Sequence, residues 1–106
     1  PLGTVKERLT QEQVILLDVR EKKEWDAGHL GHAKLVPLSA VKSGKLTREM
    51  LKSLPKDKPI YVHCAAGGRV LKVSEILRPQ GFDIRPLKDG YDKLLKAGFE
   101  KAKPKK

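Results

Sequence analysis

The sequence has a single cysteine, few aromatic residues and no long hydrophobic run. Because Cys64 has no second cysteine to pair with, the chain cannot form an internal disulfide, and its fold must be stabilised by packing alone. Its longest aliphatic run, residues 14–17, is far shorter than the roughly 20 apolar residues that a membrane-spanning helix needs. We therefore expect no disulfide-stabilised scaffold, no membrane-spanning segment and no membrane partner.

Length and composition predict one small globular domain. The chain has 106 residues, of which 39% are hydrophobic, enough for one modest core. We expect a single domain over residues 1–106, with residues 101–106 forming a basic tail outside the core. Residues 1–4 include no initiator Met and no signal-type apolar region, which is typical of a processed N-terminus. The expected compartment is the cytoplasm, and a secreted or periplasmic mature form stays open.

Basic residues outnumber acidic ones by 23 to 13, which gives a net charge of +10 at neutral pH. The lysines are spread from Lys6 to Lys106, and the aromatic residues lie mostly in apolar segments rather than between basic ones. We therefore expect a solvated basic surface with no nucleic-acid partner, whose field attracts small anions. His29 and His32 have no further ligands at suitable spacing, so we expect no metal site.

Short apolar runs alternate with amphipathic stretches along the chain. Runs typical of strands in a parallel sheet lie at residues 14–19 and 60–62, with weaker ones at 35–38 and 84–87. Helical patterns lie at residues 21–27, 48–54 (after a Thr47 cap), 69–77 and 91–97, and Thr10-x-x-Gln13 predicts the cap of one further turn. This alternation predicts an α/β domain with a central, mostly parallel sheet flanked by helices.

Cys64 follows one of these strands and opens a loop of small residues, Ala65-Ala66-Gly67-Gly68, before Arg69 begins a helix. Ligands of open α/β sheets bind beyond the carboxyl ends of the strands, where this order places the thiol. The backbone N–H groups of residues 65–69 can curl around one anion if the two glycines adopt left-handed conformations. Because the helix N-terminus and the Arg69 guanidinium add positive charge, we expect a stabilised Cys64 thiolate that is nucleophilic at neutral pH.

The same segment also allows interpretations without chemistry. Cys64 could be a small buried residue at a strand end, although such a residue has no need of a Gly-Gly-Arg loop. His63 is adjacent, but alternation along the strand directs its side chain to the opposite face. We therefore expect His63 to be a structural histidine with satisfied hydrogen bonds rather than a catalytic base.

Three motifs resemble those of the rhodanese family of sulfurtransferases. The loop Cys64-Ala65-Ala66-Gly67-Gly68-Arg69 is similar to its active-site pattern C-x-x-G-x-R. The stretch Leu17-Asp18-Val19-Arg20-Glu21-x-x-Glu24-Trp25-x-x-Gly28-His29-Leu30 resembles the family's N-terminal D-V-R-x-x-x-E-(aromatic)-x-x-G-H-I. The third, Lys88-Asp89-Gly90-Tyr91-x-x-Leu94-x-x-Ala97-Gly98-Phe99, is similar to its C-terminal G-G-W-x-x-W-x-x-A-G-x-P. The chain departs from these patterns at Gly31-His32, at Asp89-Gly90-Tyr91 and after Phe99, all of which concern turns.

The resemblance implies a rhodanese-like three-layer fold and a thiosulfate sulfurtransferase. In such an enzyme Cys64 would take a sulfane sulfur from a small anionic donor such as thiosulfate, carry it as a persulfide, and pass it to cyanide, a thiol or a protein acceptor. Residues 65–69 would bind the substrate and the persulfide, and no metal or organic cofactor is implied. Side chains of the first motif would support the loop without acting in catalysis, namely Asp18, Arg20, Glu24 and His29.

Two other functions remain as alternatives. A cysteine phosphatase or arsenate reductase shares the order of strand, cysteine loop and helix but has the longer pattern C-x-x-x-x-x-R, and here position 70 is Val. The shorter loop suits one sulfur atom better than a tetrahedral phosphate. The chain could instead be a noncatalytic binding or signalling module of rhodanese-like fold, or a redox sensor whose Cys64 is oxidised to a sulfenic acid.

Overall fold

The centre of the protein is a four-stranded, wholly parallel sheet, seen in a computed structural model that describes residues 2–42, 52–65 and 68–102. Its strands are β1 (Ile15–Asp18), β2 (Ala33–Leu35), β3 (Ile60–His63) and β4 (Ile84–Pro86), in the order β2-β1-β3-β4. In this register Asp18, the last residue of β1, is the partner of His63, the last residue of β3. The carboxyl ends of the two central strands therefore lie side by side.

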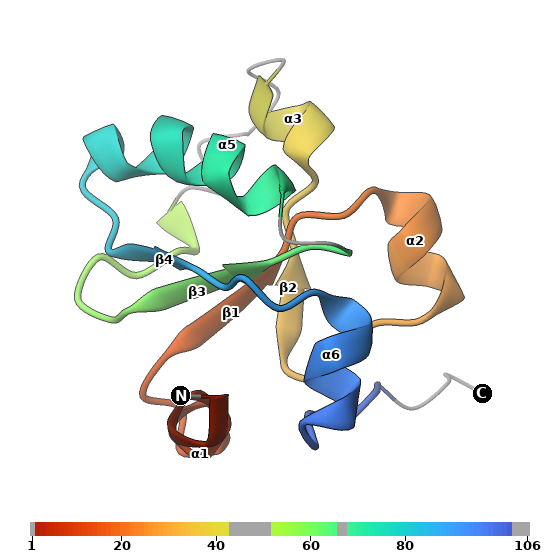
Figure 1. Ribbon diagram of the computed structural model, residues 1–106. Helices are drawn as coiled ribbons and strands as arrows, with labels where there is room; N and C mark the ends of the chain where they lie inside the picture. The colour runs from red at the N-terminus through yellow and green to blue at the C-terminus, as the bar shows by residue number, and fades with distance from the viewer. Residues whose placement is uncertain (1, 43–51, 66–67, 103–106) are drawn as a thin grey trace.

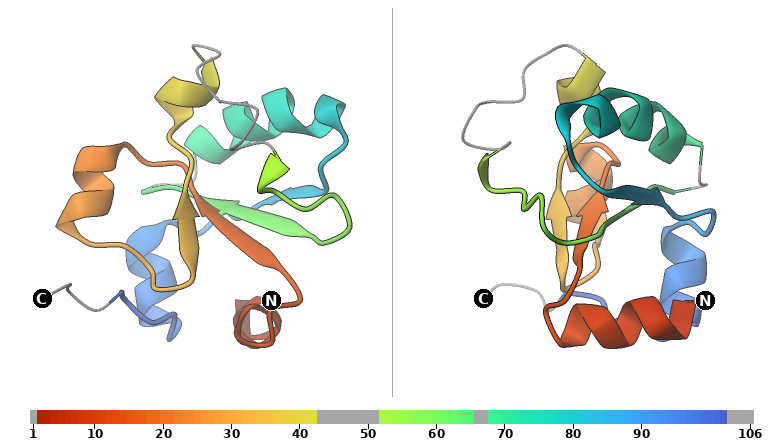
Figure 2. Two further views of the ribbon diagram at one scale, coloured as in Figure 1. Left: turned by 180° about the vertical axis from the view of Figure 1, so that it is seen from behind. Right: turned by 90° about the vertical axis from the view of Figure 1, so that its left-hand side faces the viewer.

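Helices cover both faces of the sheet and its carboxyl end, so the domain has three layers (Figures 1 and 2). The helices are α1 (Leu2–Thr10), α2 (Lys22–Ala27), α3 (Leu38–Lys42), α5 (Arg69–Leu77), the 3-10 turn η1 (Arg78–Gln80) and α6 (Tyr91–Lys96). Figure 1 shows α3 and α5 above the sheet, α1 and α6 below it, and α2 beyond the carboxyl ends of the strands. None of the helices in the described segments is long and apolar enough to cross a membrane.

Each face of the sheet has its own hydrophobic core. Alternation along β1 directs Leu17 toward α3 and α5, and Leu16 toward α1 and α6. The core on the side of α3 and α5, called the upper core, also contains Val62 and Cys64. The buried face of α5 contributes Val70, Val73 and Leu77 to it. The core on the side of α1 and α6, called the lower core, contains Val5 and Leu9 of α1, Leu94 of α6, Leu30 and Phe99. Burial on both faces explains why the central strands are nearly continuous apolar runs.

Most of the predicted elements are confirmed. β1 and β3 lie in the two strongest apolar runs, β4 falls within residues 84–87, and α5 has the predicted bounds. α2 and α6 also occupy their predicted segments, and Gly98 follows α6 with a left-handed φ of 97°. Most of the predicted helix at 48–54, with its Thr47 cap, lies outside the described residues.

Two secondary-structure predictions in the N-terminal half of the chain are wrong. The strand expected at residues 35–38 instead spans Ala33–Leu35, and Leu38, just after Pro37, begins α3. Thr10 caps no following turn, because it is the last residue of α1 and its Oγ1 donates a hydrogen bond to the Lys6 carbonyl at 3.0 Å. The apolar spacing of Leu2, Val5 and Leu9 is the local signal that could have identified α1.

Candidate functional site at the carboxyl end of the sheet

Cys64 immediately follows β3 and lies at the carboxyl end of the sheet, close to the start of α5. Its side chain joins the upper core, and the residue is only 1% exposed. Of the loop that follows, Ala65 and Gly68 are exposed, whereas Ala66 and Gly67 lie outside the described residues. The site therefore combines a buried thiol with two exposed residues, Ala65 and Gly68, the second of which directly precedes a helix N-terminus.

Gly68 does not have the backbone conformation expected for an anion-binding loop. Its φ of −76° and ψ of −38° are right-handed helical values, so the expected left-handed conformation is wrong at this position. Gly68 precedes Arg69, the first residue of α5, and its backbone already has the conformation of that helix. The expectation for Gly67 concerns a residue outside the described part of the loop.

Arg69 is held by Glu24 across the gap between α5 and α2. Its Nη1 and Nη2 donate hydrogen bonds to Oε1 and Oε2 of Glu24, at 2.7 and 2.9 Å. This bonding lowers the pKa of the Glu24 carboxyl to about 2 and raises that of the Arg69 guanidinium. The sequence-based expectation assigned the full charge of Arg69 to the thiolate, whereas the structure pairs this guanidinium with a carboxylate as well.

Glu24 owes its position to the start of α2. The Glu21 and Glu24 side chains form a reciprocal capping box, in which the Glu21 N–H donates to Glu24 Oε1 at 3.0 Å. Ser39 of α3 in turn donates to Glu21 through its hydroxyl and through its backbone N–H. The spacing of Glu21 and Glu24 was a visible capping signal, but nothing local indicated that Arg69, 45 residues away from Glu24, would bind the same carboxylate.

Asp18 and Arg20 form a buried ion pair beside the end of β3. The Asp18 side chain is 0% exposed, and its carboxylate accepts bonds from Arg20 Nε at 3.0 and 3.1 Å and from Nη2 at 2.8 Å. Arg20 Nη2 also donates to the Gly28 carbonyl at 2.8 Å. The pair thus ties the end of β1 to the C-terminal end of α2.

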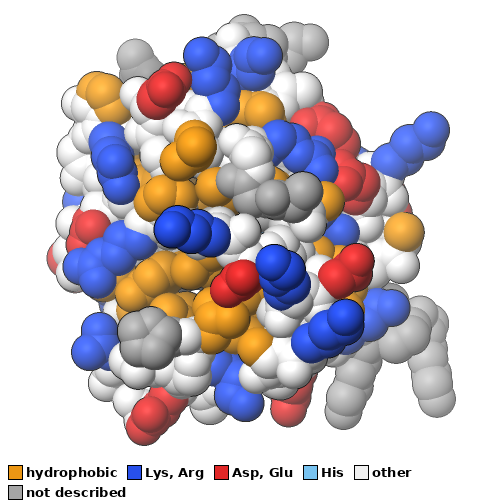
Figure 3. Space-filling model, viewed as in Figure 1, with side chains coloured by type: hydrophobic (Ala, Val, Ile, Leu, Met, Phe, Trp, Pro, Cys, Tyr) orange, Lys and Arg blue, Asp and Glu red, His pale blue; other side chains and the backbone are white. Residues whose placement is uncertain are grey.

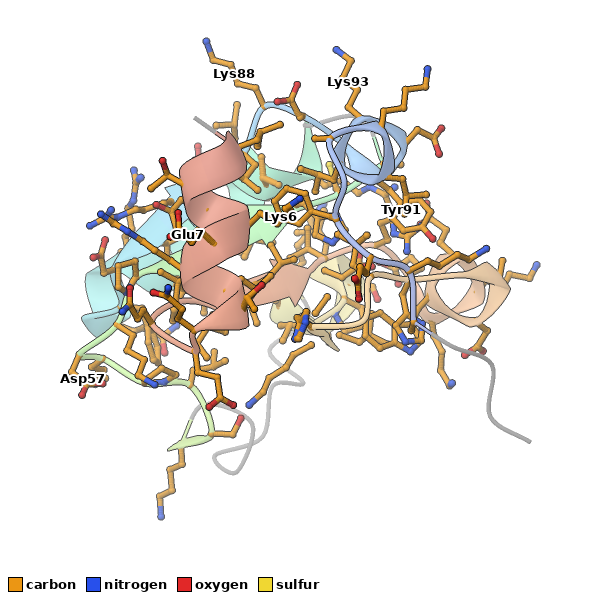
Figure 4. All side chains as sticks on the ribbon, turned by 90° about the horizontal axis from the view of Figure 1, so that it is seen from below. Lys6, Glu7, Asp57, Lys88, Tyr91 and Lys93 are labelled. Atoms are coloured by element: carbon orange, nitrogen blue, oxygen red, sulfur yellow. The ribbon has the colours of Figure 1, made fainter. Side chains whose placement is uncertain are left out.

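Tyr91 connects this ion pair to Cys64, a link that the sequence did not reveal. The Arg20 guanidinium carbon lies 4.1 Å from the centre of the Tyr91 ring. The Tyr91 backbone N–H donates to the Cys64 carbonyl at 2.9 Å. In Figure 4 Tyr91 lies inward beneath α6, whereas Lys88 and Lys93 project outward. The third motif therefore contacts the backbone of the cysteine directly.

His63 lies on the opposite face from Cys64, as predicted, but its hydrogen bonds are not satisfied. The side chain is 0% exposed, and neither ring nitrogen has a hydrogen-bond partner among the described residues. Its Nε2 lies 3.8 Å from Asp18 Oδ2, and its ring stacks against that of Tyr91 with centres 6.4 Å apart. Burial lowers the His63 pKa, which favours a neutral ring.

His29 and His32 lie outside this network. The His29 ring stacks on Trp25 with centres 3.6 Å apart, and its Nδ1 lies 3.1 Å from the Trp25 carbonyl oxygen. His32 is exposed. Within the described segments, no three His, Cys, Asp or Glu side chains are arranged to hold a metal ion. Both histidines are thus accounted for by turn structure and surface position.

Comparison with known proteins matches this arrangement to one family. Residues 2–97 match the Rhodanese-like domain family. Curated relatives include the uncharacterized protein YqhL of Bacillus subtilis, 35% identical over 74% of this chain, and a probable adenylyltransferase/sulfurtransferase MoeZ of Mycobacterium tuberculosis, 34% identical over 66%. These alignments cover 58% and 17% of the two relatives, so the chain spans little more than half of the first and a small part of the second.

Solved structures share the fold over nearly the whole chain. A rhodanese-related protein from Thermoplasma volcanium has a TM-score of 0.75 and 27% identity, covering 95% of this chain and 93% of its own. The human single-domain sulfurtransferase TSTD1 also has a TM-score of 0.75, with 26% identity, covering 90% of this chain and 92% of its own. With the cysteine loop at the carboxyl end of a parallel sheet and a family match over residues 2–97, the chain belongs to the rhodanese-like domain family.

Proposed function

We propose that this protein is a sulfurtransferase in which Cys64 carries a sulfane sulfur as a persulfide. The observation that carries the proposal is the position of Cys64 at the carboxyl end of β3, with Arg69 starting α5 five residues later. The first N–H groups of a helix have no acceptor within the helix and attract negative charge. An anionic sulfur attached to Cys64 would be stabilised at this position.

The proposed reaction has two displacement steps. In the first, the Cys64 thiolate attacks the sulfane sulfur of a donor such as thiosulfate, a new S–S bond forms at Cys64, and the S–S bond of the donor breaks. The electron pair of that bond leaves on sulfite. In the second, cyanide or a thiolate attacks the outer sulfur, and the electron pair of the Cys64 persulfide bond returns to Sγ. A protein thiol is a further candidate for the acceptor.

The burial of Cys64 adds a condition to this chemistry. Because the residue is 1% exposed, a donor can reach Sγ only when the groups that cover it move aside.

The names of relatives support the reaction class more than the substrate. MoeZ and a tRNA sulfurtransferase of Desulfurococcus amylolyticus, 33% identical over 84% of this chain, are named sulfurtransferases, as is human TSTD1. Another relative, of Protochlamydia amoebophila, is named a tRNA uridine(34) hydroxylase. The donor and acceptor therefore have to be established by experiment.

Mass spectrometry of the intact protein tests the proposal. After incubation with thiosulfate and removal of excess donor, we expect a species heavier by one sulfur atom, which cyanide converts back to the parent while thiocyanate appears. Cys64→Ser should show neither, with an unchanged circular dichroism spectrum, because an alcohol cannot carry the persulfide. Sulfur transfer at the parental rate by the serine variant would refute the assignment.

A further inference from the structure

Arg69 and Glu24 behave as one fixed unit at the approach to Cys64. Both carboxylate oxygens of Glu24 bind the guanidinium, and the capping bond from the Glu21 N–H holds the carboxylate in place from the other side. The side chains of Arg69 and Glu24 are 31% and 35% exposed, so the pair is accessible from solvent. An anionic donor would have to compete with a bidentate carboxylate for this guanidinium.

The charges of this unit do not add up to a positive site. Arg69 begins α5 five residues after Cys64 and interacts electrostatically with Cys64, Glu24 and Glu21. Two carboxylates against one guanidinium leave one negative charge. The buried Asp18–Arg20 pair adds no net charge to this sum.

The net charge of +10 does not reverse this local balance. On the face of the molecule seen in Figure 1, Figure 3 shows Lys and Arg side chains spread among Asp and Glu side chains, with no single basic patch. Exposed charges are screened over about 8–10 Å at ordinary ionic strength. The charges that interact with Arg69 at the start of α5 therefore matter more for donor binding than the distant surface lysines.

Resting on the proposed sulfurtransferase function, we propose that Glu24 determines donor specificity by neutralising Arg69, so that Cys64 accepts sulfane donors with one negative charge or none, thiol persulfides among them, in preference to the thiosulfate dianion. With a thiol persulfide R–S–SH, the Cys64 thiolate attacks the outer sulfur and the donor S–S bond breaks. The electron pair leaves on R–S⁻, and the proton stays on the transferred sulfur. No oxidant or reductant is needed.

A comparison of two small donors tests the role of Glu24. Thiosulfate carries two negative charges and benzenethiosulfonate carries one, and both deliver a sulfane sulfur to a thiolate. For a separation taken as about 6 Å in water, removing one negative charge should raise kcat/KM about tenfold for the dianion and about threefold for the monoanion. Glu24→Gln should therefore increase the ratio of thiosulfate to benzenethiosulfonate kcat/KM about threefold, while the glutamine oxygen can still accept the capping bond.

Asp26→Asn is the matched control, because Asp26 lies on the same helix and pairs with Lys22 at an exposed site. It removes the same formal charge, and we expect its donor ratio to stay at the parental value. If Glu24→Gln does not fold, Glu21→Gln removes the other carboxylate while leaving the Glu24–Arg69 pair intact, and should shift the ratio in the same direction. An unchanged ratio in the folded variant, or an equal change in Asp26→Asn, would overturn the proposal.

These outcomes are distinct from failure of the proposed function. If the parent forms a persulfide that is lost in Cys64→Ser, the sulfurtransferase assignment stands whatever the donor ratio shows. If neither donor adds sulfur to the parent, the assignment itself fails. A loss of activity with both donors in Glu24→Gln would show that Glu24 serves only to build the loop, which also contradicts a role in specificity.

Discussion

Replacing Asp18 with asparagine should destabilise the folded protein far more than any surface charge change. The carboxylate is 0% exposed and Arg20 only 5%, so the substitution would leave a guanidinium buried without a counter-charge. Removing one partner of a buried, hydrogen-bonded ion pair costs about 3–5 kcal/mol. The asparagine oxygen could accept one bond from Arg20, as the Gly28 carbonyl does, but no counter-charge would remain and the new amide N–H donors would face the guanidinium.

Urea denaturation followed by circular dichroism would measure the loss in free energy of unfolding. Thermal denaturation would measure the accompanying change in Tm. For a domain of this size each kcal/mol lowers Tm by about 4–8 °C, so Asp18→Asn should melt at least about 12 °C below the parent. Asp26→Asn, which affects an exposed pair with Lys22, should change the free energy of unfolding by about 0.5 kcal/mol or less.

The double variant Asp18→Leu with Arg20→Met tests the cause of the loss. Removing both charges avoids leaving either one buried alone, so the pair of substitutions should be less destabilising than Asp18→Asn. If Asp18→Asn is too unstable to purify, recovery of a folded double variant would establish the same order of stability. A loss below about 1 kcal/mol in Asp18→Asn, or a double variant that is less stable than the single one, would refute the reasoning.

Two further perturbations test the site. Burial lowers the His63 pKa below 6.5, so the unfolded chain binds a proton that the folded protein does not, and the free energy of unfolding should decrease as pH falls below about 6.5. Urea titrations between about pH 5 and 8 should show this slope reduced in His63→Gln and retained in His32→Gln, and equal slopes would contradict it. Inserting one glycine between Gly68 and Arg69 should lower sulfur transfer, because the lengthened loop displaces the helix N-terminus from Cys64. The parent should turn over thiosulfate without detectable aryl phosphate hydrolysis, and an insertion variant as fast as the parent would show that loop length does not matter.

Much of the architecture could be predicted because its signals are local. β1 and β3 are continuous apolar runs, since strands in the middle of a parallel sheet are covered on both faces. The apolar positions of α5 recur at helical spacing and end before Pro79 and Gly81. Cys64 directly follows β3 and is separated from α5 by a short loop. The order of strand, cysteine loop and helix therefore already implied that Cys64 lies at the carboxyl end of the sheet.

The electrostatics of the site depend on contacts between distant segments, and only the tertiary structure decided them. Arg69 is 45 residues from Glu24, and no spacing rule connects the start of α5 to the first turn of α2. The stacking of Arg20 on Tyr91 likewise required α6 to pack below the sheet. His63 was correctly assigned to the face opposite Cys64, but whether its ring nitrogens found partners depended on which side chains surround it. The sequence thus determined which residues reach the end of the sheet, whereas the packing of helices around that end determined which charges remain available to a substrate.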